Sequence, residues 1–204
     1  GYGLSEAPTA THCNPILGEK RSGSIGLPLP DVDCRIMSLA SDGLEVVQGE
    51  EGELWVSGPQ IMLGYLDELI ETKKTMKDGW LRTGDIVRMD SEGYFYLSGR
   101  IKELIKVHGM QVWPNEVEAI VSQHPSVLEC AVAGVPDETH GEGVKAWVVL
   151  KPGHTVQLGE LRTFCRGYLV GYKIPTMLEI RPFLPKTAVG KILRRVLVEQ
   201  HNPQ

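Results

Sequence analysis

The sequence changes in charge and pattern near residue 99, and this change divides it into two unlike halves. Residues 1–98 contain 8 Lys and Arg against 16 Asp and Glu, whereas residues 99–204 contain 13 against 10. The segment GRIKELIKVHG at residues 99–109 joins the halves and is itself rich in basic side chains. An acidic half joined to a basic half by a short charged segment indicates two units that meet around a ligand.

Short strands and turns dominate the pattern before residue 99. Apolar runs separated by Gly, Pro and Asp are typical of antiparallel strands and hairpins. The expected elements are strands at residues 32–39, 53–57, 85–89 and 94–97, and a polar helix at residues 67–76 that Asp67 would cap. We therefore expect a mainly antiparallel, β-barrel-like subdomain in this half.

Strand and helix patterns alternate in the second half. The expected strands cover residues 103–107, 111–112, 127–135, 144–150 and 177–183, and the expected helices cover residues 114–123, 158–169 and 191–200. The side chains expected to be buried on the last two helices are Leu161, Phe164, Cys165, Tyr168, Ile192, Leu193 and Val196. This alternation predicts a small α+β domain with a central sheet and about three helices, so the whole chain is expected to be α+β.

Several properties argue against broad classes of protein. No run approaches the ~18 consecutive apolar residues of a transmembrane helix, and no signal peptide is visible. The net charge of −5 argues against general nucleic-acid binding. From residue 145 onward there are 10 Lys and Arg against 3 Asp and Glu, which suits either a polyphosphate ligand or a solvated basic face. Because the chain begins with Gly1 rather than Met, we expect it to be a fragment.

The cysteines indicate the redox environment. Cys13, Cys34, Cys130 and Cys165 form no CxxC pair and have no histidine at ligand spacing, so zinc is not expected. Scattered single cysteines are typical of free thiols in a reducing compartment, which predicts a cytoplasmic protein.

The first motif is YGLSE at residues 2–6. Glycines beside Tyr2, including Gly3, let the backbone approach a flat ligand, and the tyrosine ring can stack on a purine. The hydroxyl of Ser5 and the carboxylate of Glu6 suit a phosphate oxygen and its Mg²⁺, because Mg²⁺ takes only one or two protein carboxylates. Taken alone, an ordinary loop is the simpler interpretation.

The second motif is GWLRTGD at residues 79–85. Asp85 follows a glycine at the start of a strand, where a carboxylate can accept both hydroxyls of a ribose. The alternative is an aspartate that caps a turn.

The third motif is the joining segment at residues 99–109. Arg100 offers a planar donor fork for ribose or phosphate oxygens, and Lys102, Lys106 and Gly109 follow it. A charged linker is the ordinary alternative.

The fourth motif is PKTAVGK at residues 185–191. Lys191 would bring a mobile positive charge to the start of a helix, which favours an anion. The motif is not a Walker loop, because Pro185 stands where that loop has its first glycine. An exposed lysine at a helix start is the alternative.

In their order and spacing, the four motifs resemble the adenylate-forming superfamily, which contains acyl-CoA synthetases, peptide-synthetase adenylation domains and firefly luciferases. The resemblance covers essentially the whole chain. It implies that residues 1–98 end a large N-terminal adenylating domain, that residues 99–103 form a hinge, and that residues 104–204 form a mobile C-terminal domain. Such enzymes use ATP to convert a carboxylic acid to an acyl-adenylate, and then pass the acyl group to a thiol, usually that of coenzyme A.

The resemblance also assigns roles to single residues. Tyr2 would stack on adenine with Gly3 beside it, Ser5 would contact the α-phosphate, Glu6 would bind Mg²⁺, and Asp85 and Arg100 would hold the ribose. Lys191 would catalyse adenylation, Lys102 would be the hinge residue, Gly109 would border the entry of the CoA thiol, and Lys106 would face the active site for thioester formation.

The sequence KELIK at residues 102–106 is similar to acyl-CoA synthetases and luciferases rather than peptide synthetases. GYKIP at residues 171–175 and GKILRR at residues 190–195 look most like bacterial long- and medium-chain fatty acyl-CoA ligases. Trp113 departs from many relatives, which have a small residue or tyrosine there. A CoA ligase for aryl or other acids and a non-catalytic nucleotide-binding module remain alternatives, and nothing favours luciferase-like oxidation.

The phosphate loop and most of the acyl pocket of such enzymes lie upstream of the YGLSE motif, outside this chain. The resemblance therefore implies that the chain alone forms no adenylate and that its partners are a fatty acid or other acid, CoA and the missing N-terminal domain. Residues 1–31 are expected to be disordered or to associate with another copy of the chain. The resemblance also allows peripheral contact with a membrane.

Overall fold

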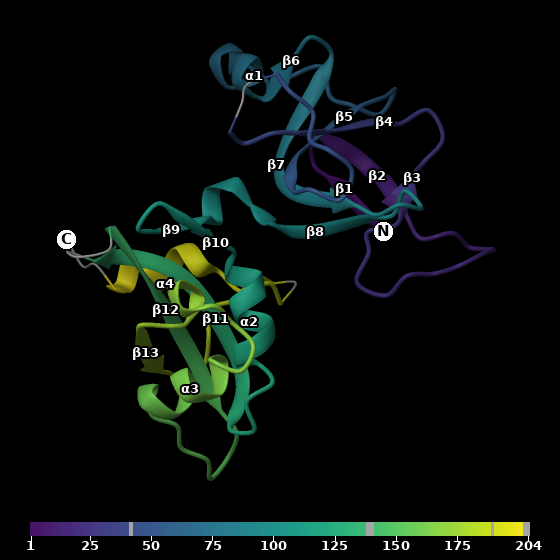
Figure 1. Cartoon of the computed structure of the whole chain (residues 1–204). Coiled ribbons are helices and arrows are strands. Elements are labelled where there is room, and N and C mark those ends of the chain that lie inside the picture. Colours follow the sequence, from purple (N-terminus) through teal and green to yellow (C-terminus); the bar gives the residue numbers. More distant parts are fainter. Residues whose placement is uncertain (41–42, 138–140, 189, 202–204) are drawn as a thin grey trace. The chain divides into compact units, whose positions relative to one another are not determined.

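The computed structural model describes residues 1–40, 43–137, 141–188 and 190–201, and it separates into two compact units (Figure 1). The first unit is Gly1–Lys102 and the second is Glu103–Gln204. The predicted α+β class is confirmed. Within the described residues, the helices are α1 (Leu69–Thr75), α2 (Pro114–Val121), α3 (Leu158–Cys165) and α4 (Arg194–His201), of which the last three lie in the second unit. No described helix is long and apolar enough to cross a membrane.

Two antiparallel sheets make up the first unit. The smaller sheet contains β1 (Tyr2–Leu4), β2 (Ala7–Cys13) and β3 (Leu27–Pro28). The larger has the order β4-β5-β7-β6, with β8 also paired to β7; its strands are β4 (Asp33–Met37), β5 (Gly52–Ser57), β6 (Met76–Lys77), β7 (Trp80–Met89) and β8 (Phe95–Arg100). The described strands form open sheets rather than a closed barrel.

One apolar core joins the two sheets. Its buried members come from both of them: Ala7, Ile36, Leu54, Val56, Leu81, Val87 and Phe95. Because successive side chains of a strand point to opposite faces, Leu54 and Val56 share the core face of β5. Burial of each large side chain contributes about 1.5–3 kcal/mol. This core sets the distance between β1, which carries the first motif, and β7, which carries the second.

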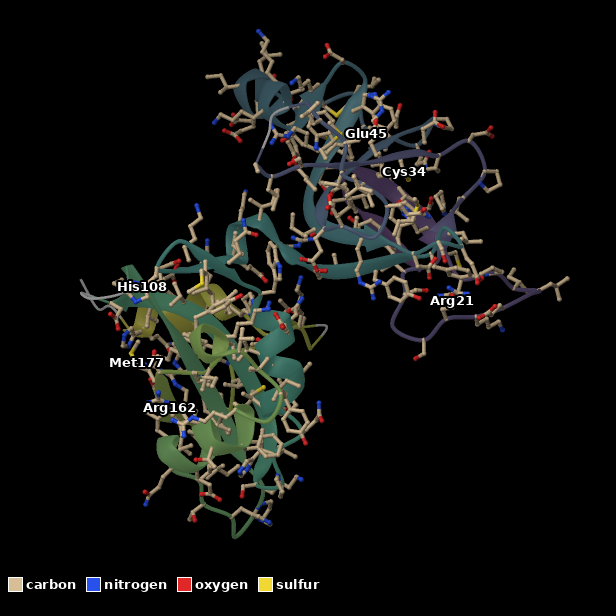
Figure 2. The ribbon with its side chains drawn as sticks, in the orientation of Figure 1. Arg21, Cys34, Glu45, His108, Arg162 and Met177 are labelled. Carbon is tan, nitrogen blue, oxygen red and sulfur yellow. The ribbon has the colours of Figure 1, made fainter. Side chains whose placement is uncertain are left out.

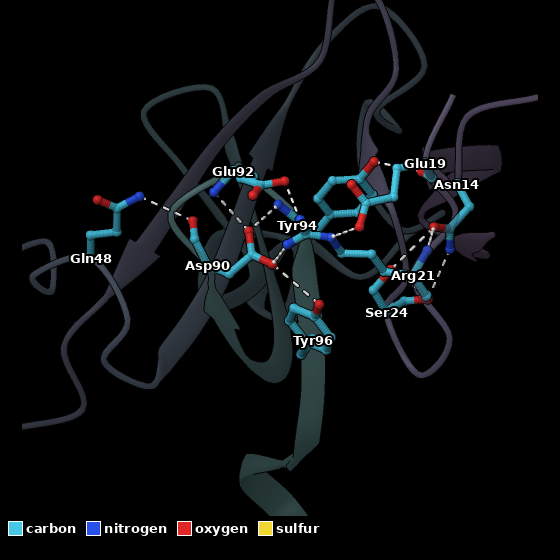
Figure 3. Close-up of polar contacts among 9 residues, drawn as sticks. All are labelled: Asn14, Glu19, Arg21, Ser24, Gln48, Asp90, Glu92, Tyr94 and Tyr96. Carbon is cyan, nitrogen blue, oxygen red and sulfur yellow. Dashed lines mark hydrogen bonds and ion pairs between the residues drawn. The ribbon is translucent and has the colours of Figure 1, made fainter. Parts of the chain in front are cut away.

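Arg21 holds the long loop between β2 and β3 against the turn between β7 and β8 (Figure 3). Its guanidinium donates to Oδ2 of Asp90 at 2.5 Å, pairs with Glu92, and lies 4.5 Å from the centre of the Tyr94 ring. Its backbone N–H donates to Oδ1 of Asn14 at 3.0 Å. One side chain therefore ties a loop without regular structure to the hairpin.

The second unit is built around one five-stranded sheet. The strand order is β10-β9-β12-β11, with β13 also paired to β12. Its strands are β9 (Ile105–Val107), β10 (Met110–Val112), β11 (Val127–Asp137), β12 (Gly141–Leu150) and β13 (Met177–Ile180). Only the β12–β13 pairing is parallel among these described strands.

Helices cover both faces of this sheet. Val132 and Ala146 face a core that includes Val117 of α2 and Leu161 of α3. The neighbouring strand residues point the other way, so that Ala131 and Trp147 contribute to a core with Leu197 of α4. The second unit thus has three layers, and its described residues form the central sheet and three helices that were predicted.

Three local expectations were wrong. Asp67 does not cap α1: it has a φ of +57°, and the N-cap residue is Glu68, without a side-chain cap. Tyr168 does not point inward, because α3 ends at Cys165 and leaves the tyrosine 62% exposed.

The third correction concerns the last helix, which begins at Arg194 rather than Lys191. A turn precedes it: the N–H of Thr187 donates to the carbonyl of Lys191 at 2.8 Å, and the N–H of Lys191 donates to the hydroxyl of Thr187 at 3.1 Å. Lys191 therefore lies on a loop and not at a helix start. The fully buried side chain of α4 is Leu197, whereas Leu193 is 36% exposed.

Candidate functional site

Three of the predicted nucleotide-binding residues are in direct contact. The hydroxyl of Tyr2 on β1 donates to Oδ2 of Asp85 on β7 at 2.6 Å. Nε of Arg100 on β8 lies 2.8 Å from Oδ1 of the same carboxylate. The antiparallel register of β7 and β8 places Asp85 opposite Arg100. The Asp85 side chain is buried, with 1% exposure, between a phenol and a guanidinium.

Aromatic packing positions the Tyr2 ring. His12 of β2 lies edge-on to it, with 5.7 Å between ring centres, and Phe95 lies 4.7 Å from His12 on the other side. Burial, and then the charge of Asp85, raise the pKa of Tyr2 well above its usual value, so the phenol remains a donor. Burial lowers the pKa of His12 to about 4, so this imidazole is neutral near pH 7.

A buried carboxylate that sequence reasoning missed contacts β7 immediately before Asp85. Glu53 on β5 is 5% exposed and accepts from the indole N–H of Trp55 at 2.8 Å and the backbone N–H of Gly84 at 3.2 Å. Gly84 has a φ of +68°, a conformation that favours glycine. The sequence feature that could have identified Glu53 was a charged residue inside an otherwise apolar strand. Glu53 therefore helps to hold the backbone of β7 at the residue before Asp85.

A pocket of about 520 Å³ lies within the first unit. It brings together three of the predicted residues, Glu6, Arg100 and Lys102, together with Tyr65 and Thr83. The other predicted residues of this unit are outside its lining: Tyr2, Gly3, Ser5 and Asp85. The pocket thus adjoins the buried Asp85 site through Arg100 rather than containing it.

Glu6 is the carboxylate predicted to bind Mg²⁺. It follows the exposed Ser5 in the turn between β1 and β2, and its Oε1 accepts from the hydroxyl of Tyr65 at 2.7 Å. That hydrogen bond is the main cause of a raised pKa for Tyr65. In the described part of the chain, no group of three or more His, Cys, Asp and Glu side chains is arranged to hold a metal. A single carboxylate suits Mg²⁺ when phosphate oxygens supply other ligands.

Gly3 has a structural reason to be glycine. A Cβ there would lie 2.6 Å from the carbonyl oxygen of Thr9 on the neighbouring strand, which is closer than real Cβ atoms approach. The close β1–β2 pairing therefore requires glycine independently of any ligand.

In the second unit, Lys106 and Gly109 lie on one tight hairpin. Val107 pairs with Met110, and the two residues between them, His108 and Gly109, have φ values of +50° and +78°. Positive φ at both central residues is the type I′ geometry of two-residue hairpins. Figure 2 labels His108 at this turn. A Cβ on Gly109 would meet no described atom within 4 Å, so backbone conformation is the local reason for glycine.

Glu142, which the sequence did not single out, anchors this hairpin. Its Oε2 accepts from the backbone N–H of Lys106 at 2.6 Å. A Cβ on Gly134 would lie 2.9 Å from Oε1 of Glu142, so the bare glycine makes room for the carboxylate to cross the sheet.

The lysines predicted for catalysis and hinge motion are solvent-exposed. Lys102 belongs to the short 3₁₀ turn Ile101–Glu103, and Lys191 to the loop before α4. Among the described residues, no ion pair or hydrogen bond is recorded for the Lys191 side chain; its near neighbour Val189 lies outside the described residues. The roles assigned to these lysines stay predictions.

Comparison with known families matches both units of the chain. Residues 1–66 match the model of the AMP-binding enzyme, and residues 116–191 match that of the AMP-binding enzyme C-terminal domain. The chain belongs to the AMP-binding enzyme family. This confirms the predicted membership of the adenylate-forming superfamily.

The relatives within the AMP-binding enzyme family agree with this. A long-chain-fatty-acid–CoA ligase of Yersinia pestis is 49% identical over 200 residues, which is 98% of this chain but 35% of the relative. The structure of ATP-bound MatB from Rhodopseudomonas palustris matches 99% of this chain and 40% of its own, with a TM-score of 0.93 and 33% identity. An o-succinylbenzoate CoA synthetase from Bacillus subtilis, in complex with its acyl-adenylate, matches 96% of this chain and 40% of its own, with a TM-score of 0.85 and 34% identity. The chain thus spans about a third of the curated relative's length.

Proposed function

We propose that this chain supplies the C-terminal part of an AMP-forming ligase that joins a long-chain fatty acid to coenzyme A. The observation that carries the proposal is the 49% identity to a long-chain-fatty-acid–CoA ligase, which extends across both units. The contact among Tyr2, Asp85 and Arg100 supports it, because these are the residues expected to bind the nucleoside.

In the first half-reaction, a carboxylate oxygen of the fatty acid attacks the α-phosphorus of ATP, and pyrophosphate leaves. Asp85 and Arg100 bind the ribose, and Tyr2 presents its ring to adenine while Ser5 contacts the α-phosphate. Lys191 stabilises the negative charge that grows on the phosphate oxygens, which is electrostatic catalysis. Exposure on a loop suits a lysine that must reach a substrate.

In the second half-reaction, the thiol of coenzyme A attacks the acyl carbonyl, the thiol proton is lost, and AMP leaves. Rotation about Lys102 withdraws Lys191 and presents the hairpin of Lys106 and Gly109. The boundary between the compact units at residues 102 and 103 supports this assignment of the hinge.

Mg²⁺ enters this proposal with the nucleotide. Glu6 would hold it together with phosphate oxygens, since Mg²⁺ takes only one or two protein carboxylates at such sites. A bound ion would supply charge neutralisation on the phosphates. A cytoplasmic location, and partnership with the upstream adenylating domain, belong to the same proposal.

A CoA ligase for aryl acids is the second candidate. The structural similarity to an o-succinylbenzoate CoA synthetase favours it, but identity to that enzyme is 34% against 49% for the fatty-acid ligase. A non-catalytic nucleotide-binding module is the third, and it predicts that Lys191 is dispensable.

The test is a hybrid enzyme in which residues 1–204 replace the matching segment of the Yersinia pestis ligase. We expect oleoyl-CoA formation with ATP, and we expect Lys191→Ala to lower adenylation by about 100-fold or more. Arg195→Ala is the matched control: it lies four residues further along the chain, but its side chain is 87% exposed, pairs with Glu199 on its own helix and has no proposed catalytic role.

A hybrid with no ligase activity, or equal activity in the Lys191 and Arg195 variants, would contradict the proposal. Because the upstream part of the hybrid supplies the acyl pocket, the acid itself is identified separately, by assaying the natural full-length protein with oleate and benzoate. Preference for benzoate would favour the second candidate. The 204-residue chain alone is expected to show no ATP–pyrophosphate exchange.

A further inference from the structure

Arg194, at the start of α4, is the centre of a polar cluster inside the second unit. Its Nε and Nη2 donate to the two carboxylate oxygens of Glu118 at 2.9 and 2.7 Å. Nη1 donates to Oε2 of Glu103 at 2.8 Å, and Nη2 also donates to Oδ1 of Asn115 at 2.7 Å. The Arg194 side chain is only 17% exposed, so these contacts replace much of its hydration.

The cluster joins three separate parts of the chain. Glu103 directly follows Lys102 in the 3₁₀ turn, Asn115 and Glu118 belong to α2, and Arg194 lies three residues after Lys191. Glu118 also contacts the central sheet, since its Oε1 accepts from the backbone N–H of Val132 on β11 at 2.8 Å. One guanidinium thus connects the end of the proposed hinge, a helix and the central sheet to the C-terminal end of the loop that carries Lys191.

The same loop is held at both ends. Near its beginning, Lys186 pairs with Glu129, and the backbone N–H of Leu193 donates to the carbonyl of Pro185 at 2.9 Å to close it. Arg194 secures its end immediately after Leu193. Within the described residues, the loop is therefore attached at its base while the side chain of Lys191 extends from its exposed part.

This cluster has specific chemical requirements. A guanidinium presents its donors in a planar fork that matches a carboxylate with two parallel bonds, which a lysine ammonium cannot reproduce. Although burial lowers it, the pKa of Arg194 is raised overall by the hydrogen bond and charge of Glu118. The cation therefore remains charged beside its two acidic partners.

We propose that Arg194 is a positioning residue that orients the Lys191 loop relative to Glu103 and α2, so that Lys191 arrives at the reacting phosphate when the unit turns about its hinge. This role rests on the proposed function of Lys191. Arg194 itself touches no substrate. It acts by fixing the C-terminal end of the loop and so the position of Lys191. Position matters because a displacement near 1 Å at a reacting group costs about 100-fold in rate.

The test compares Arg194→Lys with Arg195→Lys in the hybrid enzyme. Arg195 is the adjacent residue, but its side chain is 87% exposed and pairs only with Glu199 among the described contacts. Two rates are measured: pyrophosphate release during adenylation, and thioester formation from supplied oleoyl-adenylate. Exchange of the backbone amides of residues 186–188 and 190–193 is measured in the 204-residue chain carrying the same substitutions.

We expect Arg194→Lys to lower kcat for adenylation by about 10-fold or more, with KM for ATP changed less than about 2-fold. Thioester formation from supplied oleoyl-adenylate should fall by less than about 3-fold, because Lys191 serves only the first step. Exchange in the loop should become faster, and Arg195→Lys should change none of these quantities.

Equal losses in both steps would show a general loss of stability and overturn the proposal, as would unchanged exchange in the loop. If the unmodified hybrid is inactive, the proposed function fails, and loop exchange alone decides whether Arg194 positions the loop. Glu103→Gln provides a second variant that keeps the fold and the ion pair between Arg194 and Glu118. It should also slow adenylation more than thioester formation, but by a smaller factor than Arg194→Lys. If Glu103→Gln slows neither adenylation nor thioester formation, the proposed role of the contact between Arg194 and Glu103 is overturned.

Discussion

The hydroxyl of Tyr2 donates a 2.6 Å hydrogen bond to Asp85, although the two residues are 83 positions apart in the sequence. This contact joins the small sheet to the large one at the carboxylate expected to bind ribose. Asp85 is thus engaged by both a phenol and Arg100. A ribose that binds Asp85 must share these oxygens with Tyr2 or displace its hydroxyl.

Replacing Tyr2 by phenylalanine tests the strength of this contact. The change keeps the ring but leaves a buried carboxylate oxygen without its phenolic donor, so stability should fall by about 1–3 kcal/mol. Urea unfolding of the 204-residue chain measures this change. Tyr168→Phe is the control, because Tyr168 is 62% exposed, and it should leave stability within about 0.5 kcal/mol. Equal midpoints for the two variants would show that the Tyr2 hydroxyl contributes nothing.

Protonation of His12 should destabilise the first unit in acid. Its pKa is about 4 in the folded chain against 6.5 in the unfolded chain, because the ring is buried between Tyr2 and Phe95 and beside Cys34. Above pH 6.5 neither state carries the proton. As the pH falls from 6.5 to 4, only the unfolded chain gains it, and roughly 3 kcal/mol of stability is lost. Below pH 4 this group causes no further loss.

Unfolding at a series of pH values checks the effect, with His12→Gln as the reference that cannot titrate. The difference between the two proteins should change between pH 6.5 and 4 and be flat above pH 7, which separates His12 from carboxylates that titrate in both proteins. Parallel curves throughout this range would mean that His12 has the same pKa in the folded and unfolded chains.

Removing the Glu142 carboxylate should loosen the hairpin that carries Lys106. In Glu142→Ala the N–H of Lys106 loses its acceptor, so amide exchange of residues 105–112 should increase by about 10-fold. Glu142→Gln keeps an oxygen acceptor and should exchange nearly as slowly as the unchanged chain. Glu199→Ala, a surface change on α4, serves as the control. If the glutamine variant exchanges as fast as the alanine variant, the oxygen acceptor is not what holds the hairpin.

Gly109 and Gly153 form a matched pair for testing the proposed thiol entry. Both have positive φ, +78° and +76°, and a Cβ on either would meet no described atom within 4 Å. Alanine at either position should therefore cost about 1 kcal/mol through backbone strain alone. In the hybrid enzyme, only Gly109→Ala should slow thioester formation from supplied oleoyl-adenylate. Similar thioester rates for both variants would remove Gly109 from the thiol path.

The local sequence pattern was sufficient to predict most of the secondary structure. The hairpin at Asp90 was predictable because its carboxylate accepts from the N–H groups of Glu92 and Tyr94, a contact made within five residues. Runs of apolar residues likewise placed β11 and β12. The end of α3 and the start of α4 were missed, because loop hydrogen bonds such as that between Thr187 and Lys191 compete with helix formation.

The sequence alone therefore determined the α+β class and the motifs that identify the family, and it predicted a division near residue 100, because these depend on periodicity, charge and short-range turns. The partners of buried polar groups were decided only by tertiary structure. Glu142 and Arg194 carry no local sign of their roles, since each acts on residues from other strands or helices. Burial leaves such groups no water to bind, so the folded chain must supply their partners, and which residues it supplies depends on how distant segments pack.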